Sequence, residues 1–363
     1  MKKILLFSTV TSDKPILARA LAELSGHGFY FSIKAKTGFM VPGGAEYSRP
    51  WLPGGGLAFS LLWPFWYGLY FFSLLGRTFF ARPDVLVCLS WPEQIILSPL
   101  AALFGWRVIW FRIPGTIQEP RGWLLRKLHA SAAKKAEIVV FNEEIKDKLI
   151  FNKTCRTAYA LRPALGPQDA PHQQDMFQSM VGRREHRFVI GTVIESLDRQ
   201  LIERLLSALT IALTVSPTFA LVIVGEGEQR KPLQWLIRKM NLSSHVWLAG
   251  TDIAPARWLE HVDVYAMPHD RPGLEEISHA IVAMNYGLPV LASDKADLGD
   301  IITAKVGALV DMGDAETVAR QFRRLEQAGD LRKTLGAEAK RAAEELTFER
   351  FVGDLKMILD VNA

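Results

Sequence analysis

The chain is 363 residues long but contains only two cysteines, Cys88 and Cys155, which form no CxxC pair or metal-type spacing. This excludes a disulfide scaffold, and we expect a reducing cytoplasm. The eight histidines are scattered without ligand spacing, so we predict no metal site. HExxH, GxSxG and Walker A motifs are also missing. Zinc proteases, α/β-hydrolases and P-loop enzymes are therefore set aside.

The composition is unusually apolar. Hydrophobic residues make up 49%, with 20 Phe and 10 Trp, and the excess lies mainly in the first half. The length favours two domains. A net charge of +5 suits an anionic partner such as nucleotide phosphates or acidic lipid. The cations are dispersed and no recognised module interleaves them with aromatic residues, so we predict no nucleic-acid partner.

The order of apolar runs and turns predicts two α/β domains. Residues 1–165 read as a Rossmann-like domain that opens with a strand from Lys3 to Val10, which we prefer to a signal peptide because no A-x-A-like site follows. Residues 163–186 are polar and contain proline, as expected for a linker. The second domain covers residues 187–363. Its last helix, residues 348–359, packs on one domain or the other.

Residues 57–75 form an uncharged, aromatic-rich segment that just reaches the length of a membrane span. A span would separate the first strand from its sheet partners across the membrane, and Pro64 and Gly68 interrupt the run. A buried helix is the second alternative. We favour a segment embedded in the membrane surface, because the basic helix with Arg126, Lys127, Lys134 and Lys135 fits an anionic leaflet.

Two segments of the second half could hold an anionic ligand. In VGEG, Gly225 and Gly227 end a strand and Glu226 offers an acceptor, although a plain tight turn explains the same residues. In GLEEISHAIVAMNYG, acidic residues stand at a helix start, where free N–H groups suit a diphosphate. Alternatively, Glu275 and Glu276 only cap that helix. The sequence does not decide between these alternatives.

The second half resembles family 4 glycosyltransferases of the GT-B fold. The resemblance rests on the ordered motifs LVIVGEGEQRKPLQWLI, VWLAG, VDVYAMPH, AMNYGLPVLAS and VGALV, and it covers roughly Phe188 to Phe351. It extends to the first half only in outline. Each motif is weak alone, but their combination is specific.

The resemblance implies a GT-B architecture of two Rossmann-like domains facing across a cleft. It implies a glycosyltransferase that moves a sugar from a nucleotide-sugar donor, a substrate and not a cofactor, with retention and without an essential metal. Together with the apolar segment it suggests a lipid-linked or surface-polysaccharide acceptor and a peripheral position on the inner face of the cell membrane. The alternative is a non-catalytic relative that serves as a binding or scaffold subunit of a glycan assembly complex.

By this resemblance we assign candidate roles to individual residues. Glu275 and Arg112 are the candidate catalytic residues. His279 is a possible general base, although capping or packing explains it better. The candidate donor-binding residues are Thr192, Arg199, Gly225, Glu226, Gly227, Gly250, Glu276, Ile277, Ser278 and His279.

The sequence also departs from the family pattern. The family places two glutamates eight positions apart; here the second position holds Val282 and the first holds Leu274, with Glu275 adjacent. Thr192 stands where the family has an arginine that binds diphosphate, and the nearby lysine is missing. Threonine cannot replace a bidentate guanidinium. Arg112, Arg199, Arg230 and Lys231 are the cations that we consider as replacements.

Overall fold

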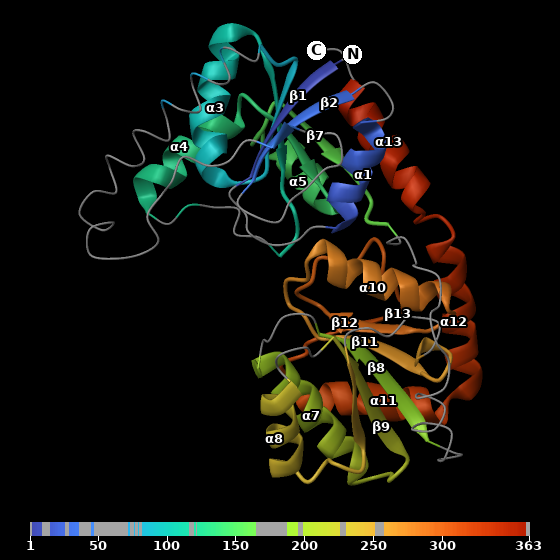
Figure 1. The fold of residues 1–363 in the computed structure, drawn as a ribbon. Helices are drawn as coiled ribbons and strands as arrows, with labels where there is room; N and C mark the ends of the chain where they lie inside the picture. The colour runs from blue at the N-terminus through green and yellow to red at the C-terminus, as the bar shows by residue number, and fades with distance from the viewer. Residues whose placement is uncertain are drawn as a thin grey trace. The chain divides into compact units, whose positions relative to one another are not determined.

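The computed structural model describes residues 2–8, 15–25, 29–35, 45–46, 72, 76, 79, 82–115, 120, 122–164, 187–194, 199–225, 230–250 and 258–360. The chain divides into two compact units. One consists of Met1–Arg162 together with Phe351–Ala363, and the other of Pro163–Arg350. In each unit helices cover both faces of a central sheet (Figure 1).

The sheet of the first unit is parallel, with the strand order β3-β2-β1-β4-β5-β6-β7. The strands are β1 (Lys2–Ser8), β2 (Phe29–Ala35), β3 (Ala45–Glu46), β4 (Val85–Cys88), β5 (Arg107–Phe111), β6 (Glu137–Val140) and β7 (Thr157–Ala160). The helices are α1 (Pro15–Ser25), α3 (Trp91–Phe104), α4 (Trp123–Ala133), α5 (Glu143–Phe151) and most of α13 (Phe348–Asp360).

The sheet of the second unit is also parallel, in the order β10-β9-β8-β11-β12-β13. Its strands are β8 (Phe188–Val193), β9 (Phe219–Val224), β10 (Val246–Gly250), β11 (Val264–Met267), β12 (Val290–Ser293) and β13 (Gly307–Val310). Its helices are α7 (Arg199–Leu213), α8 (Arg230–Lys239), α10 (Leu274–Asn285), α11 (Ala315–Gln327) and α12 (Gly329–Ala343).

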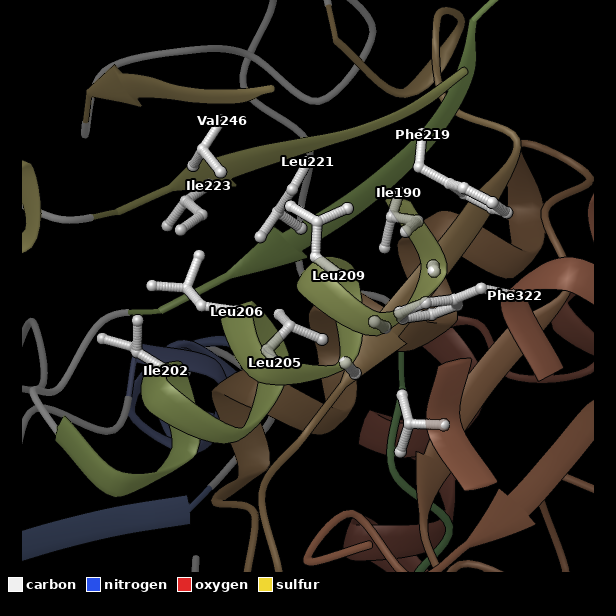
Figure 2. Packing of buried hydrophobic residues seen from close by; sticks show 14 of the residues in the cluster. Ile190, Ile202, Leu205, Leu206, Leu209, Phe219, Leu221, Ile223, Val246 and Phe322 are labelled. Atoms are coloured by element: carbon white, nitrogen blue, oxygen red, sulfur yellow. The ribbon is translucent and has the colours of Figure 1, made fainter. Parts of the chain in front are cut away.

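Helix α7 shows how the sequence builds this unit. Its apolar residues recur at the three- and four-residue spacing that places them on one helix face. Figure 2 shows that face turned toward β8 and β9, with Phe322 of α11 beside it. The labelled α7 residues of this face are Ile202, Leu205, Leu206 and Leu209. Burying each of them stabilises the fold by about 2 kcal/mol.

The structure confirms the predicted α/β class with two parallel, Rossmann-like sheets. Two predicted segments lie outside the described residues: the linker from residue 165 to 186, and the apolar segment 57–75 except for Phe72. Of the helices in the described ranges, none combines the length and the apolar character needed to cross a bilayer.

Candidate functional site

The strand order of the second sheet locates a topological switch point. From β8 the chain proceeds outward through β9 and β10, then returns to the other side of β8 as β11 and proceeds through β12 and β13. Neighbouring β8 and β11 are therefore followed by connections that leave in opposite directions. In open α/β sheets, ligands bind at such a switch point, beyond the carboxyl ends of the strands. The segments that meet there are the end of β8, the loop after β11 and the start of α10.

The first turn of α10 carries the two predicted glutamates, and they do different things. One oxygen of Glu276, Oε2, accepts a hydrogen bond of 2.8 Å from the N–H of Gly273. Glu276 therefore caps its own helix, which is the second of the two alternatives given above for the acidic residues at this helix start. Glu275 is half-buried, and its Oε1 is shielded from solvent. Leu274 is fully buried and anchors the turn.

The N-terminus of α10 also determines which backbone N–H groups are not used by the hydrogen bonds of the helix. The first four N–H groups of a helix have no acceptor within it. These belong to residues 273–276, and the next, that of Ile277, donates to the Gly273 carbonyl at 3.1 Å. The Ile277 side chain lies in the core. Ser278 is buried and His279 partly exposed. Both residues come after the first turn, where backbone N–H groups donate to carbonyl groups within the helix.

Thr192 lies near the end of β8 and is completely buried. Among the described residues its Oγ1 has no hydrogen-bond partner. Arg199 begins α7, but its side chain is outside the described part, as are Glu226 and Gly227. Arg230 and Lys231 begin α8 and are exposed. The predicted cations that the structure describes in this unit therefore lie on one helix, α8.

Gly225 and Gly250 shape the neighbouring strand ends. Gly225 directly follows β9 and has a φ of 91°, and a Cβ at this position would lie 2.9 Å from the carbonyl oxygen of Ile194. Its N–H donates to the Gly250 carbonyl at 2.9 Å. The glycine is thus required by the close approach of the β8 and β9 ends, which supports the tight-turn alternative for this residue.

The structure also shows a polar network that sequence reasoning missed. Asp270, in the loop after β11, accepts from Ser293 Oγ at 2.6 Å and from Arg204 of α7 at 3.3 Å. Beside it, both ring nitrogens of His269 are buried. Ser293 ends β12, so the network joins the ends of two strands to α7. The available signal was the polar residues at or shortly after these two strand ends, in MPHD and LASD.

A second ion pair lies at the same edge. Lys295 follows β12, and its Nζ lies 2.9 Å from Oδ1 of Asp311, which follows β13. The hydrogen bond from Lys295, assisted by the N–H of Gly313, holds the pKa of Asp311 below its ordinary value. Both Arg204 and Lys295 thus have carboxylate partners at this edge. Within the described ranges, no group of three metal-type side chains is placed to hold an ion.

Comparison with known proteins identifies the family. Residues 176–342 match the model of the family described as glycosyl transferases group 1. Over these residues, which make up somewhat less than half of the chain, the protein is similar to the group 1 glycosyl transferases. The described part of the matched region contains the switch point, the start of α10 and the Asp270 network. This confirms the resemblance found in the sequence.

Two curated relatives support this assignment. EpsD of Bacillus subtilis, whose name places it among the glycosyltransferases, is 25% identical over 187 residues, which cover 51% of this chain and 49% of EpsD. The uncharacterized glycosyltransferase MJ1059 of Methanocaldococcus jannaschii is 35% identical over 78 residues, covering 22% of this chain and 19% of MJ1059. The chain thus matches half or less of the length of these relatives.

Solved structures agree on the fold over nearly the whole chain. A glycosyltransferase from Rickettsia africae has a TM-score of 0.75 at 14% identity and covers 98% of this chain and 97% of its own. A sucrose-phosphate synthase from Thermosynechococcus elongatus has 0.70 at 17%, covering 99% and 98%. Anabaena HepE in complex with UDP-glucose has 0.70 at 13%, covering 99% of both chains. At these identities the likeness shows the GT-B fold alone.

The departures of this chain from the family pattern have clear positions in the structure. Val282 packs in the core between α10 and the sheet, with 6% of its surface exposed. No carboxylate occupies the position of the second family glutamate. Thr192 is buried as well, so neither position has an exposed polar group. Arg112 belongs to the first unit, where it directly follows β5 and is partly buried.

Proposed function

We propose that this protein is a group 1 glycosyl transferase that moves a sugar from a nucleotide-sugar to a lipid-linked or surface-polysaccharide acceptor at the membrane, with retention and without an essential metal. The observation that carries this proposal is the topological switch point between β8 and β11. The strands that form it lie within the family-matched residues, and α10, which begins with the half-buried Glu275 in its first turn, follows β11.

The second unit would bind the donor by electrostatics. The first N–H groups of α10 and the positive end of its dipole suit the diphosphate. Such preorganised donors stabilise the charge that develops on a leaving group. Glu275 would bind the donor sugar, because it is half-buried at the start of α10 and adjoins the position of the first family glutamate. Glu226 would contact the ribose or base. Structures of HepE contain UDP or UDP-glucose, which makes uridine nucleotides the first choice of donor.

The first unit would bind the acceptor, with Arg112 at the carboxyl end of β5 beside it. An acceptor carried by a lipid explains why the apolar residues gather in the first half of the chain. We infer accordingly that the protein is peripheral on the inner face of the cell membrane.

The second candidate is a non-catalytic relative that acts as a scaffold subunit of a glycan assembly complex. It is favoured by Thr192 and Val282, which are buried where the family has polar ligand-binding groups. An Arg–diphosphate pair is a charge-assisted contact that a buried threonine cannot supply.

The experiment is a thermal-shift titration with UDP, GDP, ADP and their sugar conjugates. A nucleotide at about a hundredfold its Kd adds about 2.7 kcal/mol to the free energy of unfolding. We expect one nucleotide to raise the Tm, and Glu275→Gln to weaken binding of its sugar conjugate roughly tenfold while binding of the bare nucleotide changes little. Glu316→Gln, in the exposed first turn of α11, is the matched control.

Two results would contradict the proposal. If no nucleotide shifts the Tm at saturating concentration, the scaffold function takes its place. If Glu275→Gln and Glu316→Gln give the same affinities as the wild type for the sugar conjugate, Glu275 does not contact the donor sugar.

A further inference from the structure

Helix α4 exposes its large apolar side chains, whereas a helix on the surface of a water-soluble domain normally buries them. The residues that it buries are mostly small: His129, Ala132 and Ala133. Its large apolar residues face outward instead, with exposed fractions of 67% for Trp123, 55% for Leu124, 38% for Leu125 and 46% for Leu128. A surface helix normally turns such residues to the core. Their outward orientation marks an interaction surface.

The charges on α4 identify the kind of partner. Residues 122–136 include Arg126, Lys127, Lys134 and Lys135 but no Asp or Glu. All four cations are exposed. The ammonium of Lys127 lies 5.0 Å from the centre of the Trp123 ring. Trp with a flanking Lys is characteristic of the boundary between headgroups and acyl chains, and clustered cations are attracted to anionic lipid.

The position of α4 relates this surface to the acceptor side. The helix follows β5, so its N-terminal end, which carries Trp123 and Leu124, lies toward the carboxyl edge of the first sheet. Arg112 lies at the same edge. Helix α4 contacts α3, with His129 Nε2 2.8 Å from Gln94 Oε1, and both cover one side of the sheet (Figure 1). A lipid held at this end of α4 would present its headgroup to that edge.

We propose that the N-terminal half of α4 docks on an anionic lipid bilayer, with Trp123, Leu124 and Leu128 in the interface and the helix cations on the headgroups. This inference deepens the proposed function and rests on it only where the acceptor is concerned. Docking brings the carboxyl edge of the first sheet to the surface of the bilayer, from which a lipid-linked acceptor emerges.

A second copy of the chain is a poorer occupant of this surface. A two-fold symmetric dimer places the same patch on both partners. The four exposed cations of residues 122–136, Arg126 and Lys127 in α4 and Lys134 and Lys135 just after it, would then face four identical cations without an acidic residue from either segment between them. Like charges in an interface oppose association. Anionic lipid instead complements both the charge and the apolar residues.

The test is co-sedimentation of the full chain with vesicles of phosphatidylcholine alone and of phosphatidylcholine mixed with phosphatidylglycerol. We expect binding to the anionic vesicles, weakened by salt. Replacing Lys127, Lys134 and Lys135 by Gln should weaken it roughly fivefold per charge. The Trp123→Ser/Leu124→Ser/Leu128→Ser variant should bind more than about tenfold more weakly.

The matched control is Ile150→Ser/Phe151→Ser on α5, where the exposed fractions are 52% and 87% in the same unit. This variant should bind vesicles as the wild type does. Quenching of tryptophan fluorescence by brominated lipid should also decrease when Trp123 is replaced by Phe. That measurement reports on α4 even if another part of the chain adds affinity.

Three results would overturn the proposal: equal vesicle binding by the α4 triple variant and the wild type, unchanged quenching in Trp123→Phe, or a wild-type dimer that becomes monomeric in the triple variant without vesicle binding. The nucleotide titration distinguishes this failure from that of the proposed function. A chain that binds nucleotide but not vesicles refutes docking alone, and a chain that binds vesicles but no nucleotide refutes the transferase alone.

Discussion

At the scale of single residues, Glu275 and Glu276 are neighbours in the sequence but have different environments. Glu276 bends back to the N–H of Gly273, so its carboxylate serves the helix. Glu275 does not make this bond; it is half-buried, and its Oε1 is shielded from solvent. The sequence could show two acids at a helix start. It could not show which one caps, because that depends on the path of the backbone before the helix.

Arg107 carries a buried charge that bonds both to Glu137 and to the end of α13. It donates two hydrogen bonds of 2.9 and 3.0 Å from Nε and one of 2.6 Å from Nη2 to the carboxylate of Glu137. It also donates to the carbonyls of Ile358 and Leu359 at the end of α13. One guanidinium thus satisfies a buried carboxylate and two helix-terminal carbonyls.

We predict that Arg107→Met lowers the free energy of unfolding of the first unit by about 3–5 kcal/mol, because it leaves a buried charge without its partner. Urea denaturation of the full chain, followed by tryptophan fluorescence, measures this. Lys148→Met is the control: it removes the exposed pair with Glu144 and should cost less than about 0.5 kcal/mol. Equal midpoints for the two variants would show that the buried pair contributes little.

At the scale of elements, helix α12 is fixed against the turn that ends α10. Gly336 lies in α12, and a Cβ there would be 2.0 Å from the carbonyl oxygen of Gly287. Gly287 follows α10 with a φ of 75°. The two backbones therefore touch, and the position of α10, on which the candidate site depends, is set partly by this contact.

Gly336→Ala should therefore destabilise the second unit by about 2 kcal/mol or more, since backbone atoms must move apart. In contrast, Gly353→Ala in α13 has no atom within 4 Å of the new Cβ. That variant should raise the free energy of unfolding by up to about 1 kcal/mol, because alanine favours the helix. Thermal unfolding of both variants checks the signs. A stabilised Gly336→Ala would mean that α12 and α10 do not pack this closely.

Helix and strand positions were largely predictable. The expected first strand, Lys3–Val10, is β1 (Lys2–Ser8), and the last helix, residues 348–359, is α13. Apolar periodicity carries this information. It assumes, however, that the apolar face is the buried face. Helix α4 violates that assumption, which is why its outward residues could be recognised only in the structure.

At the scale of the whole molecule, the sequence predicted two parallel α/β sheets and their order along the chain. It left open which domain the last helix joins, because an amphipathic helix shows that one face is buried but not against what. The structure groups Phe351–Ala363 with the first unit. The bonds from Arg107 to the end of α13 join residues up to 252 positions apart. Such pairings follow from the fold, so local patterns could not reveal them.

The candidate site was likewise predictable only where its residues are contiguous in the sequence. The start of α10 was found because its acids and the motif that follows are contiguous. The Asp270 network was missed because its members come from α7, the loop after β11 and the end of β12. The central claim is that these segments bind the nucleotide of a sugar donor in the second unit.

Hydrogen exchange of the full chain, measured by mass spectrometry with and without saturating UDP or UDP-glucose, tests that claim most directly. Binding slows the exchange of amides that it covers or rigidifies. We predict slower exchange in peptides that span residues 188–194 and 264–279, with little change in α3, α5 and α13. Slowing confined to the first unit, or none in the second, would contradict the account.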